Sequence, residues 1–389
     1  MASLNKVITQ LFKDNPYYIL AFIDIETELN HEMVVKYFMS LQRNPAFNPY
    51  IDVDTIPMDK HVIIKYVDKD KFNDDISILD NKDVSNILCM VCCIDKINKS
   101  SRLYIRVNHA YADGYKIIEI LSQCILKIDY NIPKFNRKTN ILSTLYHYTF
   151  GTCILFMIYI KILIQCLCNI YVYKKSQPTN GITDYVICKP FKLNKIKKFA
   201  KKNNITVNDF LYSIMIKTDK LYNKTDRNIQ TFIPFNVSKN SYTNNILPVC
   251  ININNSLDND NLLYYLHNIF DFFKYSLFIP ITVWFSPLAT YIPIKLRSNM
   301  YNLASSQQDY MFTNLISPSL DLINSNLDIN VKNIRFLNSS QYNTISFNSI
   351  SVDNNINIIC SFKEGVITNK KRFKKCVYKA YKSLLDTSR

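Results

Sequence analysis

The sequence predicts an α/β protein built from two lobes, and three observations support this fold class. The chain has 389 residues, 48% of them hydrophobic, which exceeds the usual size of one domain and is enough for a large core. Strand-like and helix-like patterns alternate along it. A Gln-Pro-Thr-Asn-Gly segment at 177–181 is typical of a linker. We therefore expect one lobe over 1–140, an apolar helix with a linker over 141–180, and a second lobe over 181–389. A single large α/β unit is the alternative.

The first lobe is expected to begin with a strand over Tyr17–Ile25 and a helix over Asn30–Leu41 that Asn30 caps. Three further strands follow, over 61–67, 87–94 and 102–107. The polar connector between the last two predicts a hairpin. After Gly114 the apolar residues recur at helical spacing. His109 is thus predicted to lie in a short loop between a strand and a helix, where rigid elements hold a side chain well.

The second lobe is expected to open with a strand over Asp184–Lys192 and an amphipathic helix over Leu193–Lys202. The lysines of that helix fall on its polar side, which indicates either a solvated face or contact with anionic lipid or cofactor phosphate. Near the end, alternating residues over 343–351 and 356–362 predict a hairpin. A basic amphipathic helix over Lys370–Leu385 closes the chain.

Two apolar segments bear on membrane contact. Residues 150–173 are long enough to cross a bilayer as a helix, but they place Lys161, Gln165 and Asn169 on one face. A transmembrane helix, a helix at the interface or packed on the protein, and a buried core helix all remain open. Residues 276–294 contain three prolines, which argues against one straight spanning helix. This second segment suits a hydrophobic lid, a shallow membrane-lying segment or a core segment.

The formal net charge of +16 is compatible with nucleic acid, an anionic membrane or a phosphorylated cofactor. No nucleic-acid-binding motif is recognisable, so we expect no nucleic-acid partner. The 11 cysteines are odd in number, and no cleavable signal peptide opens the chain, which favours reduced thiols. Cys89, Cys92 and Cys93 lie in a strand-like apolar run and are expected to pack in the core. No metal site is expected, because no ligand set has a workable spacing.

The run His109-Ala110-Tyr111-Ala112-Asp113-Gly114 is the best candidate for a reactive centre. Acyl transfer from a thioester to a hydroxyl needs a base near neutral pKa, donors for the oxyanion and orientation of both substrates. A single histidine can be that base, and the chain has 5 histidines. The four others are expected to be structural: His31, His61, His147 and His267. Asp113 is placed to brace the loop or orient the ring, and Gly114 to permit the turn; a surface histidine beside an Asp-Gly turn is the alternative.

This run resembles the active-site motif of the coenzyme-A-dependent acyltransferase superfamily, which includes chloramphenicol acetyltransferase. Within it, the chain most resembles the wax ester synthase / diacylglycerol acyltransferase family. Three further runs match that family's motifs in order, over 205–211 (Ile-Thr-Val-Asn-Asp-Phe-Leu), 232–238 (Phe-Ile-Pro-Phe-Asn-Val-Ser) and 313–318 (Thr-Asn-Leu-Ile-Ser-Pro). The resemblance spans the chain from about Tyr17 to the final helix.

The resemblance implies two chloramphenicol-acetyltransferase-like sandwich lobes with mixed sheets and an active-site channel between them. It implies that a fatty acyl group passes from acyl-CoA, a co-substrate rather than a bound cofactor, to a long-chain alcohol or diacylglycerol. His109 carries over as general base and Asp113 as the residue that shapes the loop. The channel residues carried over are Asn108, Gly114, Asn208, Asp209 and Asn314, the last as an oxyanion or substrate donor. A monomer on the cytosolic face of the endoplasmic reticulum or an equivalent membrane is implied.

Two departures from the family pattern keep alternatives open. Asn108 stands where the family has the first of two histidines, and Ile316-Ser317 stand where it has Pro-Gly. The chain is therefore either an O-acyltransferase of this kind, an acyltransferase with a different acceptor such as a sterol, or a non-catalytic relative that binds lipid or a partner at a membrane.

Overall fold

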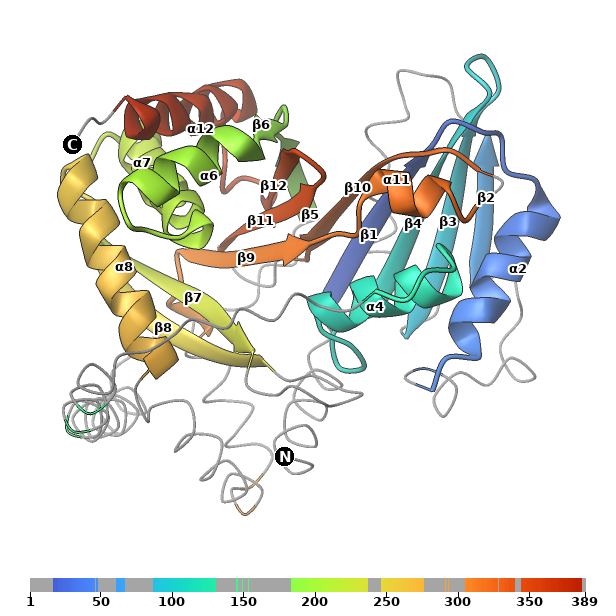
Figure 1. Ribbon diagram of the computed structural model, residues 1–389, viewed down its shortest axis with the longest axis horizontal. Coiled ribbons are helices and arrows are strands. Elements are labelled where there is room, and N and C mark those ends of the chain that lie inside the picture. The colour runs from blue at the N-terminus through green and yellow to red at the C-terminus, as the bar shows by residue number, and fades with distance from the viewer. Residues whose placement is uncertain are drawn as a thin grey trace.

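The computed structural model describes residues 17–45, 47, 61–66, 87–130, 145, 149, 153, 183–236, 246–275, 291, 293, 305–327, 329–339 and 344–386. Within these ranges two lobes lie side by side, each built on its own mixed sheet (Figure 1). Helices cover a face of each sheet, so each lobe has its own hydrophobic core. The predicted α/β class with two lobes and mixed sheets is confirmed for these residues.

The first sheet has five strands in the order β10-β1-β4-β3-β2. They are β1 (Tyr18–Ile25), β2 (Val62–Tyr66), β3 (Leu88–Asp95), β4 (Ser100–Asn108) and β10 (Val331–Asn338). Only β2 and β3 run parallel. Helices α2 (His31–Gln42) and α4 (Gly114–Cys124) cover one face, and Asn30 caps α2 as expected by accepting from the Met33 N–H.

Strand β10 comes from the second half of the chain, yet it pairs with β1 along its length in the first sheet. The register runs from Ile19 opposite Asn338 to Ile25 opposite Val331. The next strand along the chain belongs to the second sheet. A crossing strand therefore joins the two lobes, and the first lobe is completed by residues far from it in sequence.

The second sheet follows the order β5-β12-β11-β9-β7-β8, with β6 also paired to β12. Its strands are β5 (Thr183–Ile187), β6 (Phe191–Lys192), β7 (Asn228–Asn236), β8 (Ile246–Asn254), β9 (Tyr310–Ile316), β11 (Ile345–Val352) and β12 (Asn355–Lys363). Strand β9 is parallel to both β7 and β11. The hairpin β11–β12 turns through Asp353, whose φ of 50° lies in the left-handed region.

A layer of four helices packs on this sheet: α6 (Leu193–Lys202), α7 (Val207–Asn223), α8 (Asn259–Tyr275) and α12 (Lys370–Leu385) (Figure 1). Their buried apolar residues form one cluster with those of the strands. The short helix α11 (Leu320–Asn324) follows β9 and packs in the core of the first lobe. The two basic helices predicted from the sequence, α6 and α12, have the expected bounds.

The strand expected over Asp184–Lys192 is wrong in one respect, because it divides into β5 and β6. Pro190 lies between them and has no N–H to donate to the ladder, which interrupts pairing with β12. The apolar helix expected within 150–173 lies outside the described residues apart from Cys153, and so does most of the segment 276–294. Within the described ranges, no helix combines the length and the apolar character needed to span a bilayer.

The cysteines of β3 pack in the core, as expected. Cys89, Cys92 and Cys93 are at most 1% exposed. Burial raises the pKa of the Cys89 thiol to about 11 and that of Cys92 to about 12. These thiols therefore stay protonated at neutral pH and are poor nucleophiles.

Candidate active site

His109 follows the last residue of β4, a central strand of the first sheet. Its backbone N–H donates to the Tyr17 carbonyl over 2.7 Å, and its ring lies 5.5 Å from the Tyr17 ring, centroid to centroid. The ring is half-buried, and its Nδ1 atom is shielded from solvent. A strand end and an aromatic neighbour thus hold the imidazole in place.

Asn108 and Asp113 shape the loop on either side of His109. The Asn108 side-chain oxygen accepts the Ala110 N–H over 2.9 Å, which closes a turn around the histidine. The Asp113 carboxylate accepts the Lys116 N–H over 2.8 Å and is the N-cap of α4. Both side chains are about 95% buried, at 5% and 4% exposure. Asn108 therefore has a structural role in the loop even though it replaces a histidine of the family pattern.

Gly114 allows β9 to approach α4 closely. A Cβ at this position would lie 3.0 Å from Cδ1 and 3.2 Å from Cδ2 of Leu315. The residue does not have a positive φ, so the expectation that this glycine permits the turn is wrong. Its small size matters instead, because Leu315 of β9 packs into the core of the first lobe.

Two tyrosines of the first lobe fasten β9 in this position. The Tyr115 hydroxyl donates to the Asn314 carbonyl over 3.3 Å, and the Tyr130 hydroxyl donates to the Ile316 carbonyl over 2.7 Å. Burial raises the pKa of each of these hydroxyls to about 12, so both remain donors at neutral pH. The loop that carries His109 and strand β9 therefore meet at the junction of the lobes (Figure 1).

Asn314 is held from two directions in the second lobe. Its side-chain nitrogen donates to Oδ1 of Asn208 over 2.6 Å, and its Oδ1 accepts from the Ser349 hydroxyl over 2.9 Å. Asn208 is an exposed residue of the first turn of α7, and Ser349 lies opposite Asn314 on β11. The structure thus brings together two residues predicted for the site, Asn208 and Asn314, and adds Ser349.

Asp209 is placed differently from Asn208. It is fully buried and forms a capping box with Thr206, whose N–H it receives over 2.7 Å. The same oxygen lies 2.8 Å from Nδ1 of His267 in α8, and the other ring nitrogen lies 3.4 Å from Asp271. These contacts fix the first turn of α7 against α8. His267 is structural, as expected, and it supports the turn that carries Asn208.

The turn after β9 needs no glycine. Ile316, Ser317 and Pro318 all have negative φ, and the Ser317 N–H donates to the Ser351 carbonyl over 2.9 Å. The replacement of Pro-Gly by Ile316-Ser317 is thus accommodated by an ordinary backbone and continued pairing with β11.

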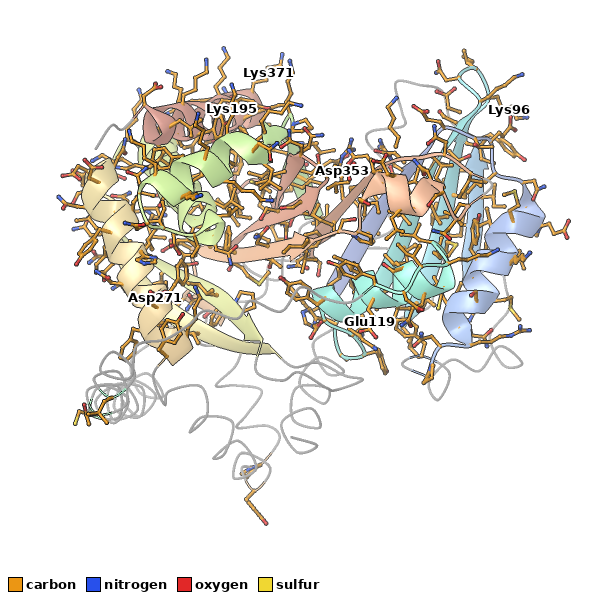
Figure 2. All side chains as sticks on the ribbon, in the orientation of Figure 1. Lys96, Glu119, Lys195, Asp271, Asp353 and Lys371 are labelled. Atoms are coloured by element: carbon orange, nitrogen blue, oxygen red, sulfur yellow. The ribbon has the colours of Figure 1, made fainter. Side chains whose placement is uncertain are left out.

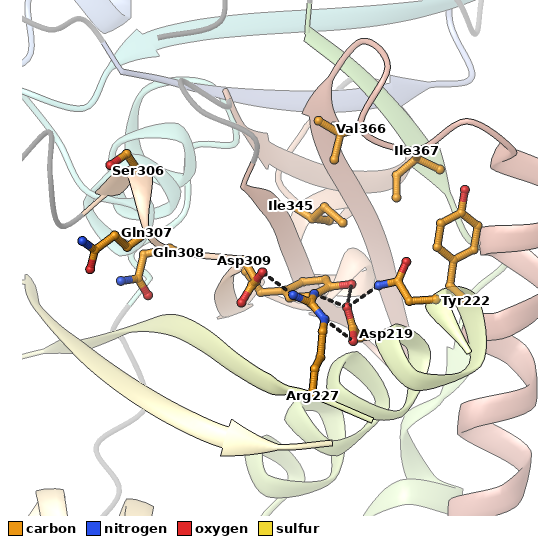
Figure 3. Close-up of a pocket in the computed structure, with 12 residues that line it drawn as sticks. Asp219, Tyr222, Arg227, Ser306, Gln307, Gln308, Asp309, Ile345, Val366 and Ile367 are labelled. Atoms are coloured by element: carbon orange, nitrogen blue, oxygen red, sulfur yellow. Dashed lines mark hydrogen bonds and ion pairs between the residues drawn. The ribbon is translucent and has the colours of Figure 1, made fainter. Parts of the chain in front are cut away.

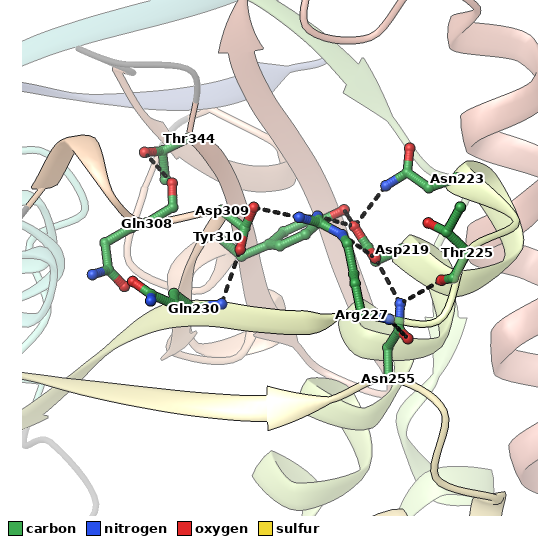
Figure 4. A network of polar contacts seen from close by, with 10 residues as sticks. All are labelled: Asp219, Asn223, Thr225, Arg227, Gln230, Asn255, Gln308, Asp309, Tyr310 and Thr344. Carbon is green, nitrogen blue, oxygen red and sulfur yellow. Dashed lines mark hydrogen bonds and ion pairs between the residues drawn. The ribbon is translucent and has the colours of Figure 1, made fainter. Parts of the chain in front are cut away.

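A separate pocket of about 230 Å³ lies in the second lobe between α7 and the start of β9 (Figure 3). The buried carboxylate of Asp219 forms its floor, with Arg227 bound to it over 2.6 Å and to Asp309 over 2.6 Å. The network around Asp219 is completed by Asn223, Asn255 and Tyr310 (Figure 4). The hydrogen bonds that Arg227 donates to Asp219 raise the pKa of Arg227 further above its ordinary value. Because Arg227 bridges both carboxylates and neutral side chains donate to Asp219 as well, we interpret this cluster as structural.

Three of these features are not predicted from the sequence: Ser349, the contact of His267 with Asp209, and the Asp219 network. Apart from the bond between Asn223 and Asp219, these contacts join residues at least eight positions apart in sequence, and most join different elements. The sequence does contain a signal for the role of Asp209. A threonine followed three residues later by an acidic residue, as in Thr206 and Asp209, indicates a capping box at the start of a helix.

Several solved structures resemble this chain over nearly its whole length. The wax ester synthase/diacylglycerol acyltransferase from Marinobacter aquaeolei VT8 gives a TM-score of 0.59 at 9% identity, covering 97% of both chains. Trichothecene 15-O-acetyltransferase from Fusarium sporotrichioides gives 0.60 at 11% identity, covering 98% of this chain and 94% of that chain. The condensation domain of the monacolin K polyketide synthase MokA gives 0.55 at 8% identity, covering 98% and 95%.

No family model matches the sequence, and no curated protein matches it either. At identities of 8 to 11%, the structural likeness defines the fold. The resemblance inferred from the four sequence motifs is therefore confirmed at this level: the chain has the two-lobed fold of these acyltransferases and condensation domains.

Proposed function

We propose that this chain is an O-acyltransferase that moves a fatty acyl group from acyl-CoA to a long-chain alcohol or diacylglycerol, with His109 as general base. The observation that carries the proposal is the position of His109, half-buried at the end of β4 where the first lobe meets β9. The fold shared with the wax ester synthase/diacylglycerol acyltransferase and the acetyltransferase supports the reaction class. Both lobes come from one chain, so a monomer suffices for the proposed site.

The proposed reaction needs one proton carrier. His109 takes the proton of the acceptor hydroxyl, and the oxygen attacks the carbonyl carbon of the thioester. The tetrahedral intermediate carries its negative charge on the former carbonyl oxygen. It collapses by breaking the carbon–sulfur bond, and the leaving thiolate takes the proton back from the imidazolium. The products are an ester and free coenzyme A, and His109 returns to its neutral state.

Other residues are assigned supporting roles in this reaction. Nε2 of His109 is the proposed proton acceptor, because Nδ1 is shielded from solvent. Asn314 is the proposed hydrogen-bond donor to the oxyanion, since an amide nitrogen has two N–H groups and one is used on Asn208. Asp113 acts through the loop, as the cap of α4, and is a positioning residue.

The test measures ester formation by the purified full-length chain with labelled acyl-CoA and, in separate reactions, hexadecanol, diacylglycerol and a sterol. His109→Ala is expected to lower the rate about 10²- to 10⁴-fold. His31→Ala is the matched control, because His31 lies exposed at the start of α2, and it should leave the rate unchanged. Ester formation that persists in His109→Ala would overturn the role of His109.

The non-catalytic alternative is motivated by Asn108, which replaces the first histidine of the family pattern. The same assay decides it. A wild-type chain that forms no ester with any of the three acceptors would support a lipid- or partner-binding relative instead. If ester forms with the sterol and with neither of the other two acceptors, the chain is an acyltransferase whose acceptor is a sterol.

A further inference from the structure

Helices α6 and α12 form a continuous basic surface on the outside of the second lobe. Together they contain twelve of the 47 basic residues of the chain and none of its 31 acidic residues. Phe191, which leads into α6, packs against Tyr381 of α12 at 4.4 Å between ring centroids and against Tyr378 at 5.5 Å. Figure 2 shows Lys195 and Lys371 on the same outer side of the lobe. We call this surface the lysine face.

The lysines of this face do not take part in the packing of the lobe. The apolar sides of both helices are already buried in the core of the lobe, through residues such as Ile196, Phe199, Phe373 and Val377. The exposed lysines of the face are Lys195, Lys197, Lys198, Lys201, Lys202, Lys370, Lys371, Lys375, Lys379 and Lys382. Lys370 pairs with Asp184 over 2.6 Å. The other nine form no ion pair with a carboxylate of the described residues.

We propose that the lysine face docks this protein on the surface of an anionic phospholipid membrane. Clusters of four to eight basic residues on an amphipathic helix bind anionic lipid head groups, and here two such helices present a face about 24 Å long, from the 16 residues of α12. The docking is electrostatic and peripheral, because no large apolar side chain of α6 or α12 is exposed.

The composition of the face favours a lipid surface over nucleic acid. Its unpaired charges are all lysines, whereas nucleic-acid recognition favours the planar fork of arginine. The one arginine, Arg372, is already occupied, since it donates to the Tyr222 carbonyl and lies 5.1 Å from the Tyr222 ring. Single-stranded nucleic acid also needs exposed aromatic platforms, and Tyr378 and Tyr381 are packed on Phe191.

The composition also favours lipid over a protein partner. Stable protein interfaces have a buried apolar or aromatic centre and are depleted in lysine. The lysine face has the opposite character. The proposal does not rest on the proposed acyl transfer, because binding to a membrane is measured without substrate.

The test is co-sedimentation of the full-length chain with vesicles of phosphatidylcholine alone or with 30% phosphatidylserine. The face variant carries Lys195→Gln, Lys198→Gln, Lys371→Gln and Lys375→Gln, two exposed lysines from each helix. The control variant changes four exposed lysines of the first lobe in the same way: Lys36, Lys96, Lys127 and Lys332. Both variants lose four charges from the +16 of the wild type, and circular dichroism checks that both are folded.

We expect the wild type to bind only the vesicles with phosphatidylserine, and to be released as salt rises from 0.05 to 0.5 M, since the Debye length falls well below 10 Å. The face variant should bind about 100-fold more weakly or worse, and the control variant should bind within a few-fold of the wild type. Wild-type binding that is absent or independent of phosphatidylserine overturns the proposal. So does equal weakening in the control variant, which would indicate net charge alone.

Two further arms distinguish other ligands with the same chemistry. A fluorescent 20-nucleotide single strand that binds the wild type more tightly than the vesicles, and is lost in the face variant, would assign the face to nucleic acid. Calorimetric binding of free coenzyme A that disappears in the face variant would assign the lysines to a soluble phosphate ligand. Neither result is expected, and either would overturn membrane docking as the role of this face.

Discussion

The side-chain nitrogen of Asn314 donates a hydrogen bond of 2.6 Å to Oδ1 of Asn208, joining β9 to the first turn of α7. The Ser349 hydroxyl fixes the other end of the same amide. Because both the nitrogen and the oxygen of the Asn314 amide are hydrogen-bonded, its second N–H points in a fixed direction. A preorganised donor to an oxyanion requires such a fixed direction. The two asparagines are thus separable experimentally, because only one is proposed to reach the reacting oxygen.

Asn314→Ala is expected to lower kcat about 10²-fold, because it removes the proposed donor to the oxyanion. Asn208→Ala keeps that donor and loosens its orientation, so a loss of about tenfold or less is expected. Steady-state kinetics on both variants, with kcat and KM separated, provide the comparison. Equal losses in the two variants would mean that Asn314 acts only by positioning.

Asp113→Ala should destabilise the protein by about 1 kcal/mol, because it removes the cap of α4. Asp113→Ser retains a capping oxygen and is expected to recover most of both stability and activity. Urea unfolding measures the free energy, and the acylation assay measures the rate. If the serine variant is stable but inactive, the carboxylate has a chemical role that capping does not explain.

Gly114→Val is expected to push β9 away from α4, since a Cβ there would lie 3.0 Å from Leu315. We expect a loss of stability of about 1–3 kcal/mol, typical of overpacking. Leu315→Ala in the same chain frees space for the valine, so the double variant should be less destabilised than the sum of the single variants. Additive effects of the two changes on the free energy of unfolding would argue against this contact.

Tyr130→Phe tests the bond that fastens β9 to the first lobe, and its effect should depend on pH. Near neutral pH, loss of the 2.7 Å bond to the Ile316 carbonyl should cost about 1 kcal/mol. Burial raises the pKa of Tyr130 from 10.0 to about 12. The protonated hydroxyl therefore stabilises the fold fully below pH 10, and this contribution is lost as pH rises from 10 to 12.

Urea unfolding at pH 8 and pH 11.5 measures this dependence. The wild type should lose more free energy of unfolding over this interval than Tyr130→Phe, which lacks the ionisable group. Buried tyrosines that do not interact with Tyr130, such as Tyr104, contribute equally to both proteins and cancel in the difference. Identical losses would show that Tyr130 ionises as easily in the folded state as in the unfolded state.

Local features of the fold were predictable from the sequence because short-range chemistry determines them. The cap at Asn30, the hairpin before His109 and the bounds of α6 and α12 follow from side-chain spacing and turn residues. His109 was also placed correctly at the end of a strand and before a helix.

The pairing of distant segments was not predictable in the same way. A strand pattern such as that of β10 shows which residues face a core but not which sheet edge the strand joins, and β10 pairs with β1 some 300 residues earlier. The contact of Leu315 with Gly114 has the same character. This contact depends on how the two lobes meet. From the sequence, Gly114 was expected to permit a turn, whereas in the structure its small size allows Leu315 of β9 to approach closely.

The role of His109 as general base is decided by the rate of ester formation in His109→Ala. This rate is compared with those of the wild type and of His31→Ala under the same conditions. We expect His109→Ala to fold, as circular dichroism will show, and to form ester about 10²- to 10⁴-fold more slowly. A folded His109→Ala chain that forms ester at the wild-type rate would contradict this role.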